Sequence, residues 1–510
     1  MQLEKTTSAK AYDLNETLAY LQKNGDAWKD FSKKIAKLHD QAVVVPITES
    51  LEDYDKKRDF QKTSEPNSQD ENFDASVVNN QFVIHLHRAT NLHYDLRLGD
   101  ENVLKSWAIP KGLPIKKGVK RLAIQTEDHP AKYIDFEGII PKEEYGGGQM
   151  WVFETGEIEW IKKSNSKYKF RLQGKQLDAT FSLYKIKDNE WMIQRAESAE
   201  IDYLKTGIKP MLSDALKNLP KNKKQYIYEI KWDGIRAIFY KNKKETKLIS
   251  RSGRNLINNF PEFQEGKFLK VQHAIIDCEI VCLDKSGKPV FSDVISRMHR
   301  IGKDNIIKAR KTKPAYMYAF DCLYLDGKKL TAHPLVRRRE WLEAIFKSGD
   351  KARLSDIFED GKQIYDAAKA MSLEGIMAKK KNGLYHPGNR SEAWKKIKFT
   401  QTFEAHIIGY TKGKGDRIDI FGALHLANPE GDGWKYLGKV GTGFDQQKMK
   451  EIWKKINILE SISKPIKESV DEENKTTWIL PQYLCEVTYA SFASTGQLRE
   501  PVFLKMWDKD

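Results

Sequence analysis

The sequence predicts a multidomain α+β protein in which antiparallel strands dominate. Its 510 residues are enough for roughly three domains of about 150 residues each. Residues 82–98 and 226–240 carry apolar runs with the two-residue alternation of strands. Residues 400–510 contain short strand-like runs separated by glycine loops, which is typical of a small β-barrel. We therefore expect several strand-rich domains with helices added to them.

The composition narrows the range of partners and compartments. Lys and Arg total 87 against 71 Asp and Glu, a net charge of +16, which favours a polyanion such as nucleic acid. No apolar run is long enough to span a bilayer, and no apolar signal core opens the chain. The four cysteines lie in apolar runs without zinc-site spacing, so we expect reduced core residues of a cytosolic protein. They are Cys278, Cys282, Cys322 and Cys485.

Two N-terminal segments show no chemistry of their own. Residues 1–50 are predicted to be helical, with an amphipathic stripe from Trp28 to Leu38 that is typical of simple packing against a neighbouring domain. Residues 61–80 are polar and poor in apolar anchors, and we expect a mobile loop there.

The segment FVIHLHRATNLHYDLRL, residues 82–98, predicts a metal site. On a strand, His93, Asp95 and Arg97 share one face. Imidazole and carboxylate suit a divalent metal such as Mn²⁺ or Zn²⁺, and the arginine suits a phosphate beside it. A single buried histidine is more often structural. Here four of the eleven histidines lie between residues 85 and 129, His87 among them, and this clustering favours the metal.

The segment EIKWDGIR, residues 229–236, predicts a nucleophilic amine. Lys231 lies where a strand meets a glycine turn, with Asp233 and Arg236 near it. An amine attacks only when it is neutral, and burial together with neighbouring cations lowers a lysine pKa. The alternative is an ordinary surface lysine on a hairpin.

Four later segments carry candidate ligand-binding side chains on strands. Residues 273–283 place Asp277 and Glu279 on one face of an apolar strand, which is costly unless they serve a metal, a ribose or a cation. Residues 318–324 contain Phe320, which is either a stacking ring or an ordinary core residue. Residues 373–379 contain Glu374, and in residues 394–398 Lys396 and Lys398 share a face suited to a phosphate. The basic stretch after Pro334 is predicted to begin an amphipathic helix with a solvated face.

Taken in this order, these segments resemble the ATP-dependent DNA ligases and their relatives. The resemblance implies that Lys231 attacks the α-phosphate of ATP and carries AMP as a phosphoramidate. It also implies that Glu279 and Glu374 lie near Mg²⁺ or Mn²⁺. The residues that it implies as nucleotide contacts are Glu229, Arg236, Arg251, Glu279, Phe320, Glu374, Lys396 and Lys398.

Residues 51–195 resemble the 3′-phosphoesterase domain of bacterial ligase D. The segments KSWAIPKG, KRLAIQTEDHPAKYIDFEG and IPKEEYGGG carry the resemblance together with residues 82–98. It implies that Mn²⁺ or another divalent metal binds to His87, His93 and Asp95. The matching catalytic and phosphate-handling residues are Arg97, Arg121, His129 and Tyr133, with Lys111, Arg58, Asp59 and Glu65 in further matching elements. His85 stands where the family usually has glutamine.

The two resemblances together imply a domain plan. We expect a helical extension at 1–50, a barrel-like phosphoesterase domain at 51–198, a nucleotidyltransferase domain at 205–399 and an OB-fold at 400–510. We expect no polymerase domain. In the final motif Met506 stands where an arginine is expected, whereas Asp508 and Lys509 fit, and Lys505 could act in place of the arginine.

The expected function is ATP-dependent sealing of DNA breaks combined with trimming of 3′ ends, in repair by non-homologous end joining. The expected partners are DNA and the end-binding protein Ku, in the bacterial cytoplasm at the nucleoid. One alternative is an RNA ligase or mRNA-capping type of nucleotidyltransferase. The other is a DNA-end scaffold with weakened catalysis, which Met506 favours.

Overall fold

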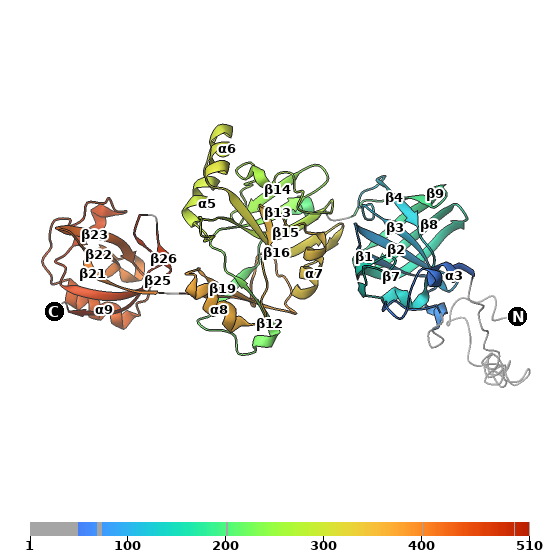
Figure 1. The fold of residues 1–510 in the computed structure, drawn as a ribbon. Coiled ribbons are helices and arrows are strands. Elements are labelled where there is room, and N and C mark those ends of the chain that lie inside the picture. The colour runs from blue at the N-terminus through green and yellow to red at the C-terminus, as the bar shows by residue number, and fades with distance from the viewer. Residues whose placement is uncertain (1–48, 69–73, 200–201, 400, 494, 509–510) are drawn as a thin grey trace, which may run out of the picture.

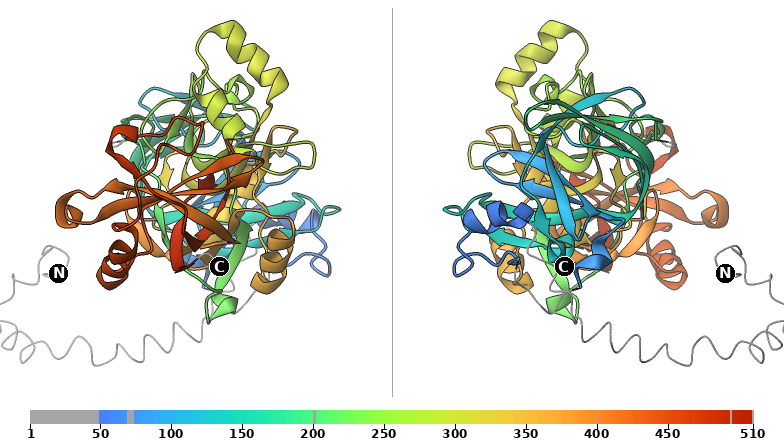
Figure 2. Two further views of the ribbon diagram at one scale, coloured as in Figure 1. Left: turned by 90° about the vertical axis from the view of Figure 1, so that its left-hand side faces the viewer. Right: turned by 90° about the vertical axis from the view of Figure 1, so that its right-hand side faces the viewer.

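Three strand-rich parts follow one another along the chain, with residues 202–399 between the other two (Figure 1). The computed structural model describes residues 49–68, 74–199, 202–399, 401–493 and 495–508. Seen along the line that joins the three parts, they overlap, and helix α6 protrudes from the middle one (Figure 2). The helix predicted within residues 1–50, with its apolar stripe, lies almost wholly outside the described residues.

The first part is a closed antiparallel barrel. Eight strands pair in the order β1-β2-β3-β4-β10-β9-β8-β7, and β7 closes the ring on β1. As the alternation predicts, Tyr94, Leu96 and Leu98 face the core, whereas Asp95 and Arg97 face the other way. The elements are α3 (Glu49–Lys56), η2 (Ala75–Val78), β1 (Gln81–Arg88), β2 (Leu92–Asp100), β3 (Val103–Ile109), β4 (Lys120–Gln125), β5 (His129–Pro130), η3 (Ala131–Asp135), β6 (Gly138–Ile140), β7 (Gly148–Ser164), β8 (Lys167–Gly174), β9 (Asp178–Lys187) and β10 (Glu190–Arg195).

The prediction of a mobile loop over residues 61–80 is wrong for the described part of that segment. Val78 is fully buried, and Asp74 caps the short helix η2 by accepting from the Ser76 amide. Glu65 is buried as well and pairs with Arg58. Few apolar residues are needed here, because one anchor and one buried ion pair fix the backbone.

The central part contains two sheets whose strand ends meet around a cavity. A four-stranded sheet has the order β11-β20-β19-β12, and a six-stranded sheet runs β14-β13-β15-β16-β17 with β18 beside β16. The elements are α4 (Tyr203–Thr206), β11 (Leu212–Ala215), η4 (Lys223–Gln225), β12 (Tyr226–Ile230), β13 (Ile235–Lys241), β14 (Thr246–Ser250), η5 (Pro261–Phe263), β15 (Ala274–Cys282), α5 (Phe291–Met298), α6 (Lys303–Thr312), β16 (Ala315–Leu325), β17 (Lys328–Lys329), α7 (Leu335–Ile345), β18 (Ala352–Leu354), α8 (Gly361–Ala370), β19 (Gly375–Lys380) and β20 (Arg390–Lys398).

The third part is the strand-rich unit that the sequence predicts as an OB-fold. Its main sheet has the order β23-β22-β21-β25-β28, with β24 beside β21, and Met449, Ile452 and Ile456 of α9 lie in its core. The elements are β21 (Gln401–Lys412), η6 (Gly415–Arg417), β22 (Phe421–Glu430), β23 (Gly433–Val440), α9 (Gln446–Ile456), η7 (Glu473–Lys475), β24 (Thr476–Trp478), β25 (Tyr483–Tyr489), β26 (Ser491–Phe492), β27 (Leu498–Arg499) and β28 (Val502–Asp508). The predicted α+β class is confirmed.

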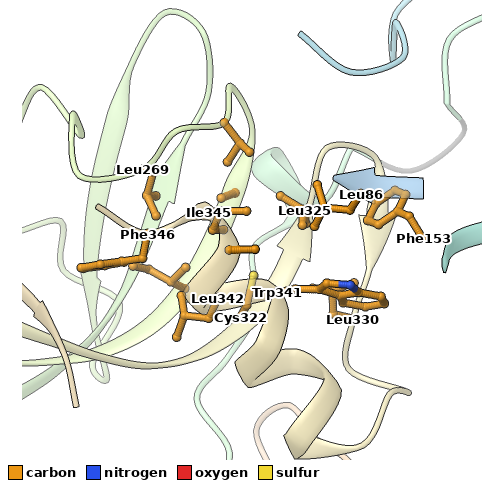
Figure 3. Packing of buried hydrophobic residues seen from close by; sticks show 14 of the residues in the cluster. Leu86, Phe153, Leu269, Cys322, Leu325, Leu330, Trp341, Leu342, Ile345 and Phe346 are labelled. Atoms are coloured by element: carbon orange, nitrogen blue, oxygen red, sulfur yellow. The ribbon is translucent and has the colours of Figure 1, made fainter. Parts of the chain in front are cut away.

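The first two parts share a hydrophobic core. One continuous cluster joins Leu86 and Phe153 of the barrel to Leu330 and Trp341 of the central part (Figure 3). All four cysteines are buried and unbridged, as predicted. Among the described helices, none combines the length and the apolar character that a membrane crossing requires.

Helix α7 corrects one expectation. The basic stretch after Pro334 does form a helix, but its arginines do not all face solvent. Arg338 is fully buried and donates to both carboxylate oxygens of Asp321, at 2.7 and 2.8 Å. Asp321 lies on β16, so the arginine compensates a carboxylate that the strand would otherwise bury alone.

Replacing Arg338 with methionine should lower the free energy of unfolding by about 3–5 kcal/mol, because Asp321 would then stay buried without a partner. Urea titration measures the change. Lys362→Met is the matched control, since Lys362 pairs with Asp366 on the exposed surface of α8 and should change stability by less than about 1 kcal/mol. Equal effects of the two variants would contradict the role of the buried pair.

Candidate active sites

A cavity of about 680 Å³ opens in the central part beside Lys231. Lys231 follows β12 directly and lines this cavity, with 21% of its side chain exposed. The backbone there is anchored, because the Lys231 amide donates to the carbonyl oxygen of Gly375 at 3.0 Å. The predicted position at a strand end, facing a ligand-sized space, is confirmed.

Beside this cavity two lysine ammonium groups pair with one carboxylate, and a third lysine lies within reach of their charge. Lys231 Nζ lies 2.5 Å from Glu374 Oε2, and Lys398 Nζ lies 3.3 Å from Glu374 Oε1. Lys396 lines the cavity, and its pKa is lowered by burial and then by the charges of Lys398 and Lys231. The lysine pair predicted for β20 therefore lies with the predicted nucleophile, and the group can bind a polyanion.

Glu279 lies on β15 and reaches the same cavity. Burial raises its pKa to about 8, although the charges of Lys231 and Arg236 act in the opposite direction. The charge of Glu374 raises it further, which places the two carboxylates within electrostatic reach of each other. Two hard oxygen donors that disfavour each other's charge fit a Mg²⁺ or Mn²⁺ ion, which would compensate both.

One wall of the cavity is aromatic. Phe320 and Trp394 both line it, and their ring centroids are 5.8 Å apart. Lys379 Nζ lies over both rings, at 4.2 and 4.3 Å from their centroids, and pairs with Glu229 at 2.8 Å. Glu229, predicted as a nucleotide contact, thus lines the cavity, and Lys379 compensates its charge.

The two remaining predicted nucleotide contacts are arginines, of which one is fixed by a carboxylate and the other is exposed. Arg236 lines the cavity and is held by Asp277, with Nε and Nη2 donating at 3.0 and 2.6 Å. Arg251 lines the cavity but is exposed. Sequence reasoning missed Trp394 and Lys379. The alternation that placed Lys396 and Lys398 on one face would have added Trp394, which lies two residues before Lys396.

The third part reaches this site through the turn after β27. Arg499 Nη1 donates to Asp233 Oδ2 at 3.0 Å, and Lys398 Nζ donates to Glu500 Oε2 at 2.7 Å. Lys505, expected as a substitute for the arginine missing from the last motif, instead pairs with Glu486 on the neighbouring strand. Met506 packs against the core of the third part, and Lys509 lies outside the described residues.

The second site lies on the barrel. His87, His93 and Asp95 each offer a ligand atom, and these atoms all lie within 4.8 Å of one another. The outer nitrogen of each imidazole contacts a backbone carbonyl oxygen, His87 Nε2 that of Gly146 at 2.8 Å and His93 Nδ1 that of Asn91 at 2.9 Å. The inner nitrogens, His87 Nδ1 and His93 Nε2, lie 3.4 and 3.3 Å from the Asp95 carboxylate, so the three residues fit a divalent metal.

Arg97 is fixed beside these ligands from three sides. Its guanidinium donates to Asp95 Oδ2 at 3.2 Å, to Ser106 Oγ at 2.9 Å and to His85 Nδ1 at 3.3 Å. Burial lowers the pKa of His85 to about 3, so the imidazole is neutral and accepts this bond. Burial opposes ionisation of Asp95, but Arg97 and the two ligand imidazoles hold its pKa well below the usual value. Ser106 was missed by sequence reasoning.

Tyr133 and His129 complete this cluster. Arg97 lies over the Tyr133 ring at 4.6 Å, and the rings of Tyr133 and His129 are 4.8 Å apart. Tyr133 Oη donates to Glu65, which also accepts from Arg58. Burial, followed by the charges of Arg97 and Arg58, holds the pKa of His129 well below its ordinary value, so it is neutral.

Three other residues predicted for this site do not join the cluster. Arg121 donates to Gln272 of the central part at 3.0 Å, and Asp326 is the one charge that raises its pKa against the effect of burial. The structure therefore does not bring Arg121 to the cluster, because its side chain is turned toward the central part. Asp59 pairs with Lys62, and Lys111 is exposed.

Three family models match the chain. Residues 210–398 match the ATP dependent DNA ligase domain, residues 417–510 the ATP dependent DNA ligase C terminal region, and residues 85–185 the DNA Ligase D 3′-phosphoesterase domain. The lysine-lined cavity lies in the first of these matches, and the histidine and aspartate cluster lies in the last.

Relatives cover nearly the whole chain. It is 34% identical over 471 residues to the multifunctional non-homologous end joining protein LigD of Mycolicibacterium smegmatis, which covers 89% of this chain and 60% of the relative. The LigD protein of Pseudomonas aeruginosa is 29% identical, with 90% and 60% covered. The crystal structure of the ligase domain from M. tuberculosis LigD is 27% identical, covers 60% of this chain and 96% of its own, and has a TM-score of 0.35.

The central and third parts thus match domains of ATP-dependent DNA ligases. With a match to the ligase D 3′-phosphoesterase domain before them, the chain is similar to the ligase D proteins over most of its length. It spans about 60% of the length of the curated ligase D relatives that it matches.

Stability should fall as pH rises from about 4.5 to about 8, by up to about 1.4 kcal/mol per pH unit from Glu279 alone. In this window the folded protein holds a proton on Glu279 that the unfolded chain has lost, so each rise in pH favours unfolding. Glu279→Gln removes the proton exchange. Urea titrations at pH 5.5 and 8.5 should show the variant gaining stability over the natural protein at the higher pH, and a difference independent of pH would contradict the assignment.

Proposed function

We propose that the chain is an ATP-dependent DNA ligase joined to a metal-dependent 3′-phosphoesterase, acting in the repair of DNA breaks by non-homologous end joining. The observation that carries the ligase proposal is the meeting of Lys231 and Lys396 at one cavity with an aromatic wall, beside Glu374, which pairs with both Lys231 and Lys398. An amine, a group of cations and flat rings are what nucleotide attachment needs.

In the first step Lys231 Nζ forms a bond to the α-phosphorus of ATP while the bond to pyrophosphate breaks. The ammonium must first lose a proton, and the carboxylate of Glu374, in direct contact with it, is placed to receive that proton. AMP then passes to a DNA 5′-phosphate, and the 3′-hydroxyl displaces AMP to seal the strand. Positioning and charge neutralisation supply most of the catalysis in such transfers.

The other residues of the cavity hold the nucleotide. We assign base stacking to Phe320 and grip on the phosphates to Lys396 and Lys398, with Arg236 and Arg251 at the sides. Glu279 and Glu374 would hold Mg²⁺ or Mn²⁺, which neutralises phosphate charge when bound.

We assign the removal of 3′-phosphate or terminal ribonucleotide groups to the barrel. His87, His93 and Asp95 would hold Mn²⁺ or another divalent metal, which polarises the phosphoryl group when bound. We assign to Arg97, fixed on three sides, and to the neutral His129 the stabilisation of the negative charge that develops in this reaction. The ring of Tyr133 packs against the Arg97 guanidinium. Arg121 has no part in this assignment, because its contacts are with the central part.

The net charge of +16 and the relatives' printed role in end joining support DNA ends as the substrate. We further propose Ku as the partner at those ends, and the bacterial cytoplasm at the nucleoid as the place of action. Both proposals come from the ligase D family.

Incubation with labelled ATP and Mg²⁺ should attach AMP covalently to the natural protein through an alkali-stable bond, and Lys231→Ala should abolish the label. Lys362→Ala is the control, because Lys362 lies exposed on α8 and should keep full labelling. If the natural protein takes no label, the chain is a DNA-end scaffold instead. Sealing of nicked DNA and nicked RNA duplexes then separates a DNA ligase from an RNA ligase.

Asp95→Ala should abolish both the Mn²⁺ binding of the barrel, measured by calorimetry, and the release of phosphate from a 3′-phosphorylated DNA strand. Loss of one of three ligands removes the site, because Asp95 is the only carboxylate among them. Sealing of a clean nick should continue. Asp178→Ala, which removes an exposed partner of Arg171, is the matched control, and full phosphatase activity in Asp95→Ala would refute the metal site.

A further inference from the structure

The barrel and the central part meet across an interface that is apolar at its centre. Phe153 of β7 packs edge-on against Trp341 of α7, with ring centroids 5.7 Å apart. Leu86, Leu330 and Trp341 belong to the same buried cluster, which runs without a break from one part into the other (Figure 3). Separating the parts would expose this apolar surface to water, which opposes free movement between them.

A buried lysine crosses the same interface. Lys328, in the two-residue strand β17, is 8% exposed at its side chain and donates to Glu154 Oε2 of β7 at 3.2 Å. It also donates to the carbonyl oxygen of Phe153. Glu154 is 4% exposed, so neither charge is solvated. Pulling Lys328 out would leave a carboxylate largely buried without its cation, which is a large penalty.

A third contact reaches the metal-binding strand itself. Tyr94 lies between His93 and Asp95 on β2, and its side chain projects away from the metal site. Its hydroxyl donates to Asp326 Oδ2 at 3.1 Å. Asp326 is itself fixed, because its Oδ1 accepts from the backbone amide of His273 at 3.0 Å. The central part thus contacts β2 on the face opposite the metal site, through Tyr94. Tyr94 lies between His93 and Asp95, two of the three metal ligands.

Two polar contacts border this interface. Arg121 donates to Gln272 at 3.0 Å, and Arg337 donates to Glu137 at 2.6 Å. An apolar centre with polar contacts at its edge is the pattern of a specific, persistent interface.

We propose that the phosphoesterase barrel and the nucleotidyltransferase part form one fixed unit, and that Tyr94 and Asp326 are positioning residues for the phosphoesterase metal ligands. The central part supports the barrel on the side away from the metal ligands. The two active sites then keep a constant separation, so a trimmed 3′ end reaches the ligase site by movement of the DNA and not by a swing of the barrel on a tether. The fixed unit requires neither of the proposed activities, whereas the positioning role rests on the proposed metal site of the barrel.

Hydrogen exchange of the full chain, read by mass spectrometry, tests the fixed unit. Lys328→Met should speed exchange on both sides of the interface, in peptides from β1, β2 and β7 and in peptides from β16 and α7, by about tenfold or more. Lys362→Met, at an exposed ion pair, should leave these peptides unchanged. Faster exchange confined to residues 325–330 would show two parts that merely touch, and would overturn the proposal.

Mn²⁺ binding tests the positioning role without any assay of activity. Tyr94→Phe removes one hydroxyl and Asp326→Asn removes one charge, and each should weaken Mn²⁺ binding several-fold in calorimetry of the full chain. Each should also change the electron paramagnetic resonance spectrum of the bound ion, which loss of stability alone would not do. Tyr168→Phe, which alters a barrel tyrosine away from the metal strand, is the matched control. Affinities and spectra equal to those of the natural protein in both variants would overturn the positioning role.

Discussion

The central part is organised by the need to hold several positive charges together in a half-buried space. Lys231, Lys396 and Lys398 repel one another, and burial together with the charges of Lys398 and Lys231 lowers the pKa of Lys396. Glu374 pairs with Lys231 and Lys398, and its negative charge offsets part of this repulsion. One four-stranded sheet supplies these four side chains, from the residue after β12, the residue before β19 and strand β20, so the fold of the central part is what brings the charges together. The phosphates of a bound nucleotide would neutralise the remaining positive charge.

The same physical problem is solved differently at the barrel. There the buried charge is that of Asp95, and Arg97 with two imidazoles keeps it ionised. His85, neutral because it is buried, accepts from Arg97 where an ionised histidine would repel it. In each site a carboxylate therefore lies among cations or hydrogen-bond donors. The excess of lysines suits an anionic substrate at the first site, and the imidazole and carboxylate ligands suit a metal at the second.

Much of the two sites could be predicted from short-range patterns. The two-residue alternation of strands correctly placed His93, Asp95 and Arg97 on one face, and Lys396 with Lys398 on another. It could not show that Arg338 is buried, because the compensating Asp321 lies 17 residues earlier on another strand. It also could not show that Arg121 turns toward Gln272, which lies 151 residues away.

The sequence by itself determined which residues are candidates to attack a phosphate, bind a metal or stack on a base, and in what order they occur. These properties depend on residue type and on neighbours within a few positions. Only the tertiary structure decided that Glu374 is the partner of Lys231, that Lys505 lies against Glu486, and that Lys328 joins the barrel to the ligase part. Such pairings join residues distant in the chain, and burial, which sets their strength, is a property of the packed molecule.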